Sequence, residues 1–235
     1  MARKERLARA VAERLRDAGY TAYFAGGCVR DRLLGIEPGD YDVATDADAA
    51  AVQTLFPRTV PVGARFGVVL VLVDDEQFEV ATFRADAEYL DGRHPTSVRF
   101  SSPEDDAQRR DFTINGMFLD PETGEVLDYV GGRADLAAGI IRAIGDPFAR
   151  LAEDRLRMLR GVRFAARFGF ALEPATLAAI SRSAPQIVDI SRERIGDEIV
   201  KILVDSPPGG ARRAFELLDE TGLLRVILPE IDALK

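Results

Sequence analysis

The spacing of hydrophobic and polar positions predicts a mixed first part of the chain. Leu7, Ala8, Val11, Ala12 and Leu15 recur as one helical face, which predicts a helix over residues 4–18. Short apolar or alternating segments follow, and these are typical of strands. We expect strands at residues 40–43, 66–73 and 78–83, with a short apolar segment at 23–25, a turn at 74–77 and a second helix at 29–35.

Helical patterns replace the strand patterns from about residue 134. Arginine-rich amphipathic helices are predicted over residues 147–168, 174–183, 191–204 and 210–220. We therefore predict an α+β fold class, with a first domain over residues 1–140 around a small mixed sheet and an all-α second domain over residues 141–235. The last residues, ILPEIDALK, are helix-like and carry no terminating signal, so we expect a longer protein to continue beyond them.

The segment over residues 85–108 is polar, contains Pro95 and Pro103, and shows no sustained period. At this length we expect a working loop rather than a plain connection. His94 is interpreted as an ordinary loop residue and Cys28 as a small packing residue.

The amino-acid composition excludes several classes of protein and several kinds of catalytic site. With 47% hydrophobic and 30% charged residues, the chain is typical of a globular protein. The longest apolar run, residues 66–73, is too short to span a bilayer, so no membrane partner is expected. One cysteine excludes an internal disulfide framework, predicts no disulfide partner and suits a reducing cytoplasm. One histidine excludes His-rich zinc sites, so catalysis would rest on carboxylates, arginines and a hard metal ion.

The net charge of −8 argues against a nucleic-acid partner when it is taken alone. The arginines are clustered, however. Six of them lie between residues 150 and 167 beside only two acids, which predicts a local basic ridge.

The first candidate site combines Gly26 and Gly27 with the pair Asp40 and Asp42. Strand period would place both carboxylates on one face, and such a pair favours Mg²⁺ bound by oxygen ligands. Paired glycines let backbone N–H groups approach a phosphate at a helix start, and Arg30 would add a charged fork. The alternative is a turn rich in Gly and Asp. The sequence has no EF-hand, no P-loop and no G-x-G-x-x-G motif.

Three further positions have two interpretations each. Glu79 would be a third carboxylate if the hairpin lies beside the Asp40 strand, and a solvated strand residue otherwise. The cluster over residues 109–116 is a surface ion pair or a triphosphate clamp. Helical spacing would put Asp154, Arg157 and Arg160 on one face, either as a solvated ion pair or as donors and an acceptor that match a base edge.

Together these segments resemble the bacterial-type (class II) tRNA nucleotidyltransferases, the CCA-adding enzymes, and the related A-adding enzymes and bacterial poly(A) polymerases. The resemblance covers nearly the whole chain in family order. It is carried by GGCVRDRLLG, DYDVAT, FEVATFR, RRDFTING, DYVGGRADL, EDRLRMLRGVRFAARFGF and SRERIGDEIVKIL.

The resemblance implies a head of the DNA-polymerase-beta-like nucleotidyltransferase fold, a helical neck, and a body and tail that this chain lacks. It implies template-independent transfer of CMP and AMP from CTP and ATP to the 3′ end of tRNA by two-metal chemistry with Mg²⁺. Asp40 and Asp42 would bind the metal, and Glu79 would complete the catalytic set. The implied nucleotide-binding residues are Gly26, Gly27, Arg30, Arg110, Asp111, Asn115, Asp154, Arg157, Arg160 and Arg163, of which Asp154 and Arg157 would pair with the base.

Sequence separates the activities within this family poorly. A loop like that of residues 85–108 is associated with adding the final A, which disfavours a CC-only enzyme. A-only addition and poly(A) synthesis stay open. A non-catalytic RNA-binding domain on the same fold is a further alternative, which the intact carboxylates disfavour.

Overall fold

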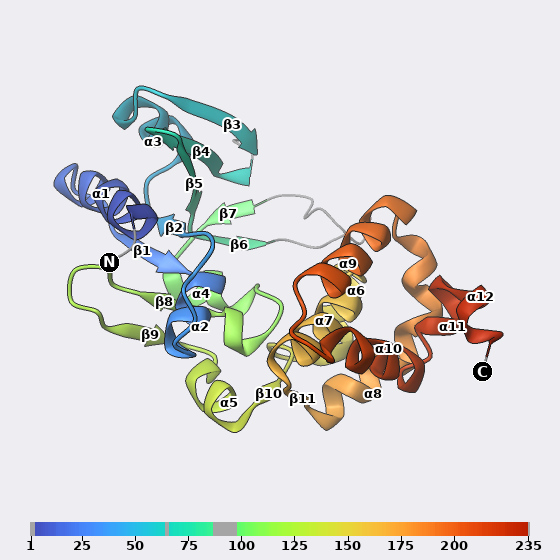
Figure 1. Cartoon of the computed structure of the whole chain (residues 1–235). Helices are drawn as coiled ribbons and strands as arrows, with labels where there is room; N and C mark the ends of the chain where they lie inside the picture. The colour runs from blue at the N-terminus through green and yellow to red at the C-terminus, as the bar shows by residue number, and fades with distance from the viewer. Residues whose placement is uncertain (1–2, 64–65, 87–97, 235) are drawn as a thin grey trace. The chain divides into compact units, whose positions relative to one another are not determined.

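A computed structural model describes residues 3–63, 66–86 and 98–234 (Figure 1). The described residues divide into two compact units. The first unit holds residues 3–63, 66–86, 98–110 and 114–133, and the second holds residues 111–113 and 134–234. The catalytic and nucleotide-selecting roles that the sequence suggests for a head and a neck stay predictions.

A seven-stranded mixed sheet forms the framework of the first unit, in the order β3-β4-β5-β2-β1-β8-β9. The pairing of β2 with β5 is parallel, and the other pairings in this sheet are antiparallel. Its strands are β1 (Ala22–Ala25), β2 (Asp42–Thr45), β3 (Thr59–Gly63), β4 (Val68–Val73), β5 (Glu76–Thr82), β8 (Met117–Leu119) and β9 (Val126–Asp128). Phe24, Phe78, Phe83 and Phe118 are fully buried and fill the core around the sheet.

Helix α1 (Arg3–Asp17) covers part of this sheet with the face that the sequence predicts, because Ala8, Val11, Ala12 and Leu15 are all buried. The remaining helices of the first unit are short. They are α2 (Gly27–Leu33), α3 (Ala49–Leu55), α4 (Pro103–Gln108) and the 3₁₀ turn η2 (Thr113–Asn115), whose first residue belongs to the second unit, and α5 (Gly132–Ala138) runs from the first unit into the second.

The second unit is mainly helical, as Figure 1 shows in yellow to red. Its helix α7 (Arg157–Phe168) buries Met158, Leu159 and Val162. The other elements are α6 (Pro147–Glu153), α8 (Pro174–Ser183), η3 (Ala184–Asp189), α9 (Arg192–Val204), α10 (Gly210–Glu220), α11 (Leu224–Ile227), α12 (Pro229–Asp232), β10 (Ile140–Ile141) and β11 (Ala171–Leu172). In the parts of the chain described here, no helix combines the length and the apolar character needed to cross a membrane.

Four expectations need correction. The all-α part contains a two-stranded parallel sheet, β10–β11. The single helix predicted over residues 147–168 is two helices, because the chain leaves helical geometry at Asp154. The predicted loop over residues 85–108 contains structure at both ends: β6 (Arg84–Asp86) pairs with β7 (Val98–Phe100), and α4 follows. Strand β2 begins at Asp42, so Asp40 precedes it. The loop residues 87–97, His94 among them, lie outside the described residues.

Candidate active site

Two carboxylates stand side by side where β2 and β5 run parallel. Val43 lies opposite Val80 in this pairing, so the preceding residues Asp42 and Glu79 are neighbours, and the side chains of both are exposed. Protein atoms surround much of the Asp42 carboxyl although it reaches solvent, and this loss of hydration raises its pKa to about 6, with the charge of Glu79 as the next cause. The hairpin therefore lies beside the strand of Asp42, which is the position that the interpretation of Glu79 as a third carboxylate requires.

Asp40 lies two residues before Asp42 in the sequence, and its side chain is largely exposed. Its Oδ1 accepts a hydrogen bond from Nζ of Lys4 at 2.6 Å, and this bond is the main reason that the pKa of Lys4 is raised. The charge of Asp40 also raises the pKa of Asp42, whereas Arg110 and Lys4 lower it. Asp42 thus lies on strand β2 but Asp40 does not, so the expected placement of both carboxylates on one strand is only partly present.

The carboxylate set suits a hard divalent cation in its chemistry, because the charges of Glu79 and Asp40 add to burial in raising the pKa of Asp42. Among the described residues, no three or more His, Cys, Asp or Glu side chains are already grouped to hold a metal ion. Mg²⁺ does not need such a cage, since it keeps several waters and binds through one or two carboxylates plus substrate phosphates. Asp40, Asp42 and Glu79 therefore fit a metal that arrives with a nucleotide.

A glycine turn lies directly beside Asp42, because β1 pairs Ala25 with Asp42 and the chain then turns at Gly26. Gly26 has φ of 69°, a conformation that favours glycine. A Cβ at this position would lie 2.9 Å from Nη1 of Arg110, so the guanidinium rests against the bare backbone of the turn. A side chain at residue 26 would separate these two groups.

The Arg110 guanidinium is oriented by Asp106 of α4. The buried Asp106 carboxylate accepts hydrogen bonds from Nε and Nη2 of Arg110 at 3.1 and 2.9 Å, and two more from Arg109 at 2.8 and 2.6 Å. Burial alone would raise the pKa of Asp106, but the two arginine charges outweigh it and the pKa is lowered. Sequence reasoning missed Asp106, whose three- and four-residue spacing from the arginines is the signal that marks it.

Arg30 points into the protein. Its side chain is buried, with Nε 2.8 Å from Asp31 and Nη1 2.6 Å from the side-chain oxygen of Asn115. These contacts tie α2 to the segment before β8. The predicted contacts of Arg30 and Asn115 with a nucleotide stay predictions, as does that of Gly27, whose Cβ would approach Nη2 of Arg30 at 3.6 Å.

Asp111 belongs to the second unit together with Arg160 of α7. The Asp111 carboxylate accepts from Nε of Arg160 at 2.7 Å and lies 2.6 Å from Nη2, and its charge is the main cause that raises the pKa of Arg160. Phe112 packs directly on α7, since a Cβ at Gly161 would lie 3.0 Å from its ring. The segment 111–113 is therefore fastened to this unit by charge and by packing.

The structure does not place Asp154 and Arg157 on one helical face. Asp154 ends α6, where its Oδ1 accepts from the N–H of Leu156 at 3.1 Å and its Oδ2 from Nη2 of Arg194 at 2.7 Å. Arg157 instead donates to the Arg150 carbonyl at 2.8 Å and pairs with Glu153. The expectation that Asp154 shares a helical face with Arg157 is wrong, because the helix is interrupted at Asp154, whereas Arg157 and Arg160 both belong to α7.

Arg163 is a further predicted nucleotide ligand that the structure places inside the protein. Its Nε donates to Glu198 of α9 at 2.7 Å, and both side chains are buried. Lys201 adds a second cation 3.0 Å from the same carboxylate. Sequence reasoning missed Arg194 and Glu198 as partners, because α9 is distant in sequence from Asp154 and α7, and it missed Glu153, whose four-residue spacing from Arg157 is a local signal.

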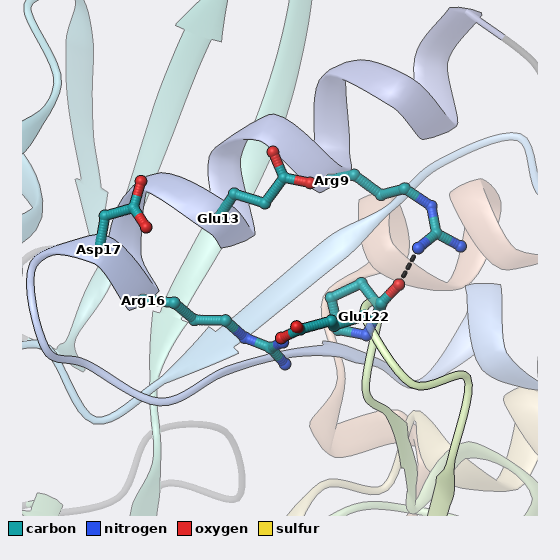
Figure 2. A pocket seen from close by; sticks show the side chains of 6 residues that line it. Arg9, Glu13, Arg16, Asp17 and Glu122 are labelled. Carbon is teal, nitrogen blue, oxygen red and sulfur yellow. Dashed lines mark hydrogen bonds and ion pairs between the residues drawn. The ribbon is translucent and has the colours of Figure 1, made fainter.

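Two hollows lie apart from these residues. One, of about 230 Å³, lies between α1 and the β8–β9 turn, where Arg9 donates to the Pro121 carbonyl and Arg16 pairs with Glu122 at 3.1 Å (Figure 2). Its arginines fasten protein segments to each other. The second, of about 670 Å³, is apolar and lies between α9 and the α11–α12 region.

The mixed sheet, with carboxylates at the start of β2 and on β5 and a glycine turn after β1, defines the head of a nucleotidyltransferase. Residues 22–142 match the protein family described as "Poly A polymerase head domain". Residues 169–235 match the family described as "Probable RNA and SrmB- binding site of polymerase A". The chain belongs to the poly A polymerase head-domain family. Proteins of this family use a divalent metal ion.

The chain is similar to CCA-adding enzymes of known sequence. It is 44% identical to that of Bacillus licheniformis over 94% of this chain and 55% of the relative. It is 46% identical to that of Geobacillus stearothermophilus over 91% of this chain and 52% of the relative. The chain thus spans about half the length of these relatives.

Solved structures show the same architecture. The Bacillus stearothermophilus CCA-adding enzyme in complex with CTP matches with a TM-score of 0.85 and 42% identity, over 95% of this chain and 53% of that one. A CCA-adding enzyme in complex with ATP matches with a TM-score of 0.78 and 25% identity, over 95% of this chain and 52% of that one. The predicted resemblance and fold class are confirmed.

Proposed function

We propose that this chain carries the catalytic part of a CCA-adding tRNA nucleotidyltransferase, which transfers CMP and AMP from CTP and ATP to the 3′ end of tRNA in the cytoplasm. The observation that carries the proposal is that Asp42 and Glu79 are neighbours on paired strands beside the Gly26 turn, with Asp40 two residues before Asp42. The relatives named for CCA addition, and their structures with CTP and with ATP, support the choice of substrates.

In this proposal Asp42 and Asp40 hold Mg²⁺ and Glu79 completes the acidic set. Bound Mg²⁺ would supply positive charge to the triphosphate and to the attacking 3′ oxygen. Arg110, oriented by the buried Asp106, would bind triphosphate oxygens over the bare Gly26 backbone, where its fork of donors matches phosphate. The positive charges of Mg²⁺ and of Arg110 would both stabilise the negative charge that develops on the leaving pyrophosphate.

Base choice is assigned to the second unit. Asp154 has one oxygen on Arg194 and the other on a backbone N–H, so its carboxylate is fixed in direction. Arg157 is fixed by Glu153 and by a backbone carbonyl. Fixed acceptors and donors are what a protein needs to read a base edge without a nucleic-acid template.

The test supplies the protein with tRNA that ends before, within or at the end of CCA, together with CTP, ATP or both, and sequences the 3′ ends. Addition of C, C and A in order supports the proposal. Addition of A alone assigns an A-adding enzyme, and long A tails assign a poly(A) polymerase. The absence of Mg²⁺-dependent incorporation at high enzyme concentration supports the non-catalytic alternative.

Asp154→Ala tests the assignment of base choice. The variant is expected to bind triphosphate normally, because Arg110 is untouched, but to accept UTP and GTP as well. Asp189→Ala is the matched control, since Asp189 pairs with the neighbouring Arg155 at 3.0 Å. Unchanged rejection of UTP and GTP by the Asp154 variant would place base choice elsewhere.

A further inference from the structure

The first turn of α1 brings two cationic side chains, those of Arg3 and Lys4, close to carboxylates of the first unit. Arg3 lies with Nη2 2.5 Å from Asp75 and 3.7 Å from Asp74, both in the turn between β4 and β5. Lys4, the next residue, contacts Asp40 and Glu76 instead. These contacts dock the helix start on the hairpin that carries Glu79.

Lys4 lies between two carboxylates. Its Nζ is 2.6 Å from Oδ1 of Asp40 and 3.6 Å from Oε2 of Glu76. The Lys4 side chain is 24% exposed and that of Glu76 30%, whereas the Asp40 side chain is 88% exposed. The ammonium is therefore held at the protein surface by the fold, and the carboxylate that it meets is open to solvent.

We propose that Lys4 is the resident counter-ion of Asp40, and that Asp40 exchanges this ammonium for the divalent cation when the site is loaded. This inference rests on the proposed function, because it takes Asp40 as a metal ligand. It assigns to the N-terminal helix a part in metal binding.

The exchange follows from charge and from distance. An ammonium and a divalent cation repel strongly when both approach one carboxylate, so they compete for Asp40. Glu76 is already within ion-pair distance of Nζ, so Lys4 keeps a carboxylate partner after it leaves Asp40. The fold thus gives the Lys4 ammonium one carboxylate partner before the exchange, Asp40, and another after it, Glu76.

The experiment titrates Mn²⁺ into the 235-residue protein and measures free Mn²⁺ by electron paramagnetic resonance. Lys4→Met is expected to bind Mn²⁺ about two- to fivefold more tightly than the wild type, which is the worth of an ion pair between partly exposed groups. Lys4→Gln provides a second uncharged variant, and Lys4→Arg is expected to keep the wild-type affinity. A thermal melt gives an independent measure: without metal, Lys4→Met melts lower, and Mn²⁺ raises its Tm by more than that of the wild type.

Arg3→Met is the matched control. It removes a charge from the same helical turn but leaves Asp40 untouched, so its Mn²⁺ affinity is expected to equal that of the wild type. Equal gains in Arg3→Met and Lys4→Met, or no gain in either Lys4 variant, would overturn the inference. Asp42→Asn separates the two proposals: if the wild type binds no more Mn²⁺ than Asp42→Asn does, the metal assignment of the proposed function fails first.

Discussion

Asp42 stands between a glycine turn on one neighbouring strand and Glu79 on the other. We predict that Asp42→Asn, and likewise Asp40→Asn, lowers the rate of nucleotide transfer by about a thousandfold or more, or about 4 kcal/mol of barrier. The reason is that the amide keeps the shape but loses the charge that holds a metal ion. Single-turnover incorporation of labelled CTP into tRNA measures the effect.

Asp46→Asn is the control for this loss. Asp46 follows the same strand, is exposed, and accepts a hydrogen bond from the backbone N–H of Thr21 at 2.7 Å. Its amide variant is expected to transfer nucleotides normally. Near-normal rates in Asp42→Asn would remove the metal assignment.

Glu198 gives a prediction for pH. Burial would raise its pKa, but the charge of Arg163 and the hydrogen bonds from Lys201 and Arg163 outweigh burial, and the pKa is held below its ordinary value of 4.5. A carboxyl with a lowered folded-state pKa stabilises the fold above its unfolded-state pKa, and this contribution is lost as the pH falls through the folded-state value. Glu198→Gln is expected to lose about 3 kcal/mol of unfolding free energy at pH 7, because Arg163 is then buried without its charged partner.

Urea denaturation across a pH series checks the sign. The difference between wild type and Glu198→Gln should shrink as the pH falls below 4.5, since the wild type loses its charged pair there. Glu216→Gln, which removes an exposed partner of Arg212, should show no such trend. A difference that stays constant in acid would contradict the role given to the pair.

Arg30 shows which contacts residue-scale sequence reasoning leaves out. An arginine after two glycines is typical of a phosphate ligand, yet its guanidinium is buried against Asp31 and Asn115. Asn115 is 85 residues away in sequence, and no local pattern reveals such a partner. The neighbouring positions of Asp42 and Glu79 were easier to predict, because strands and hairpins have local signals, whereas the strand spacing expected for Asp40 was only partly right, since β2 begins at Asp42.

At the scale of elements, the close packing of α7 makes Gly161 sensitive to substitution. A Cβ at Gly161 would lie 3.0 Å from the fully buried ring of Phe112 and 3.4 Å from Ile180. Gly161→Ala is expected to lower the unfolding free energy by about 1–3 kcal/mol, because the ring has no room to give way. Chemical denaturation measures this loss.

Gly196→Ala is the matched substitution in α9. Gly196 is exposed in the interior of that helix, and a Cβ there would meet nothing within 4 Å. This variant is expected to gain about 0.5–1 kcal/mol from helix propensity. Two substitutions of the same type should therefore move stability in opposite directions, and a stabilised Gly161→Ala would disprove the packing argument.

Helices with clear ends were predictable. The bounds expected for α8 and α10 agree with the structure, because Pro174 begins one helix and the glycines at 209–210 begin the other. The break at Asp154 was not predictable, since Asp154, Arg155 and Leu156 all occur within helices and the apolar spacing continues through them. What ends α6 is a set of tertiary contacts, the hydrogen bond from Arg194 included.

At the scale of the whole molecule, the net charge of −8 limits RNA binding. Few phosphates can be neutralised by such a chain, so the gain from counterion release is small. We predict that this protein binds tRNA with a Kd of about 1 µM or weaker at physiological salt, in the range of non-specific complexes. It should bind a nucleoside triphosphate with Mg²⁺ independently of tRNA.

Parallel titrations of labelled tRNA and of CTP at two salt concentrations test this prediction. The dependence of log Kd on log salt should be shallow for tRNA, since its slope counts the phosphates contacted. Nanomolar tRNA binding with a steep slope would show that these residues contain a full RNA-binding surface.

The segment 111–113 has one more consequence. Asp111 and Phe112 belong to the second unit, although residues 98–110 and 114–133 on either side belong to the first. No single cut of the chain can therefore separate the two units intact. A fragment that starts at Ala134 would lose the ring that fills the space at Gly161 and the carboxylate that meets Arg160. The second unit contains a piece of chain from within the first, so we expect the two units to unfold as one cooperative block rather than as two separable modules.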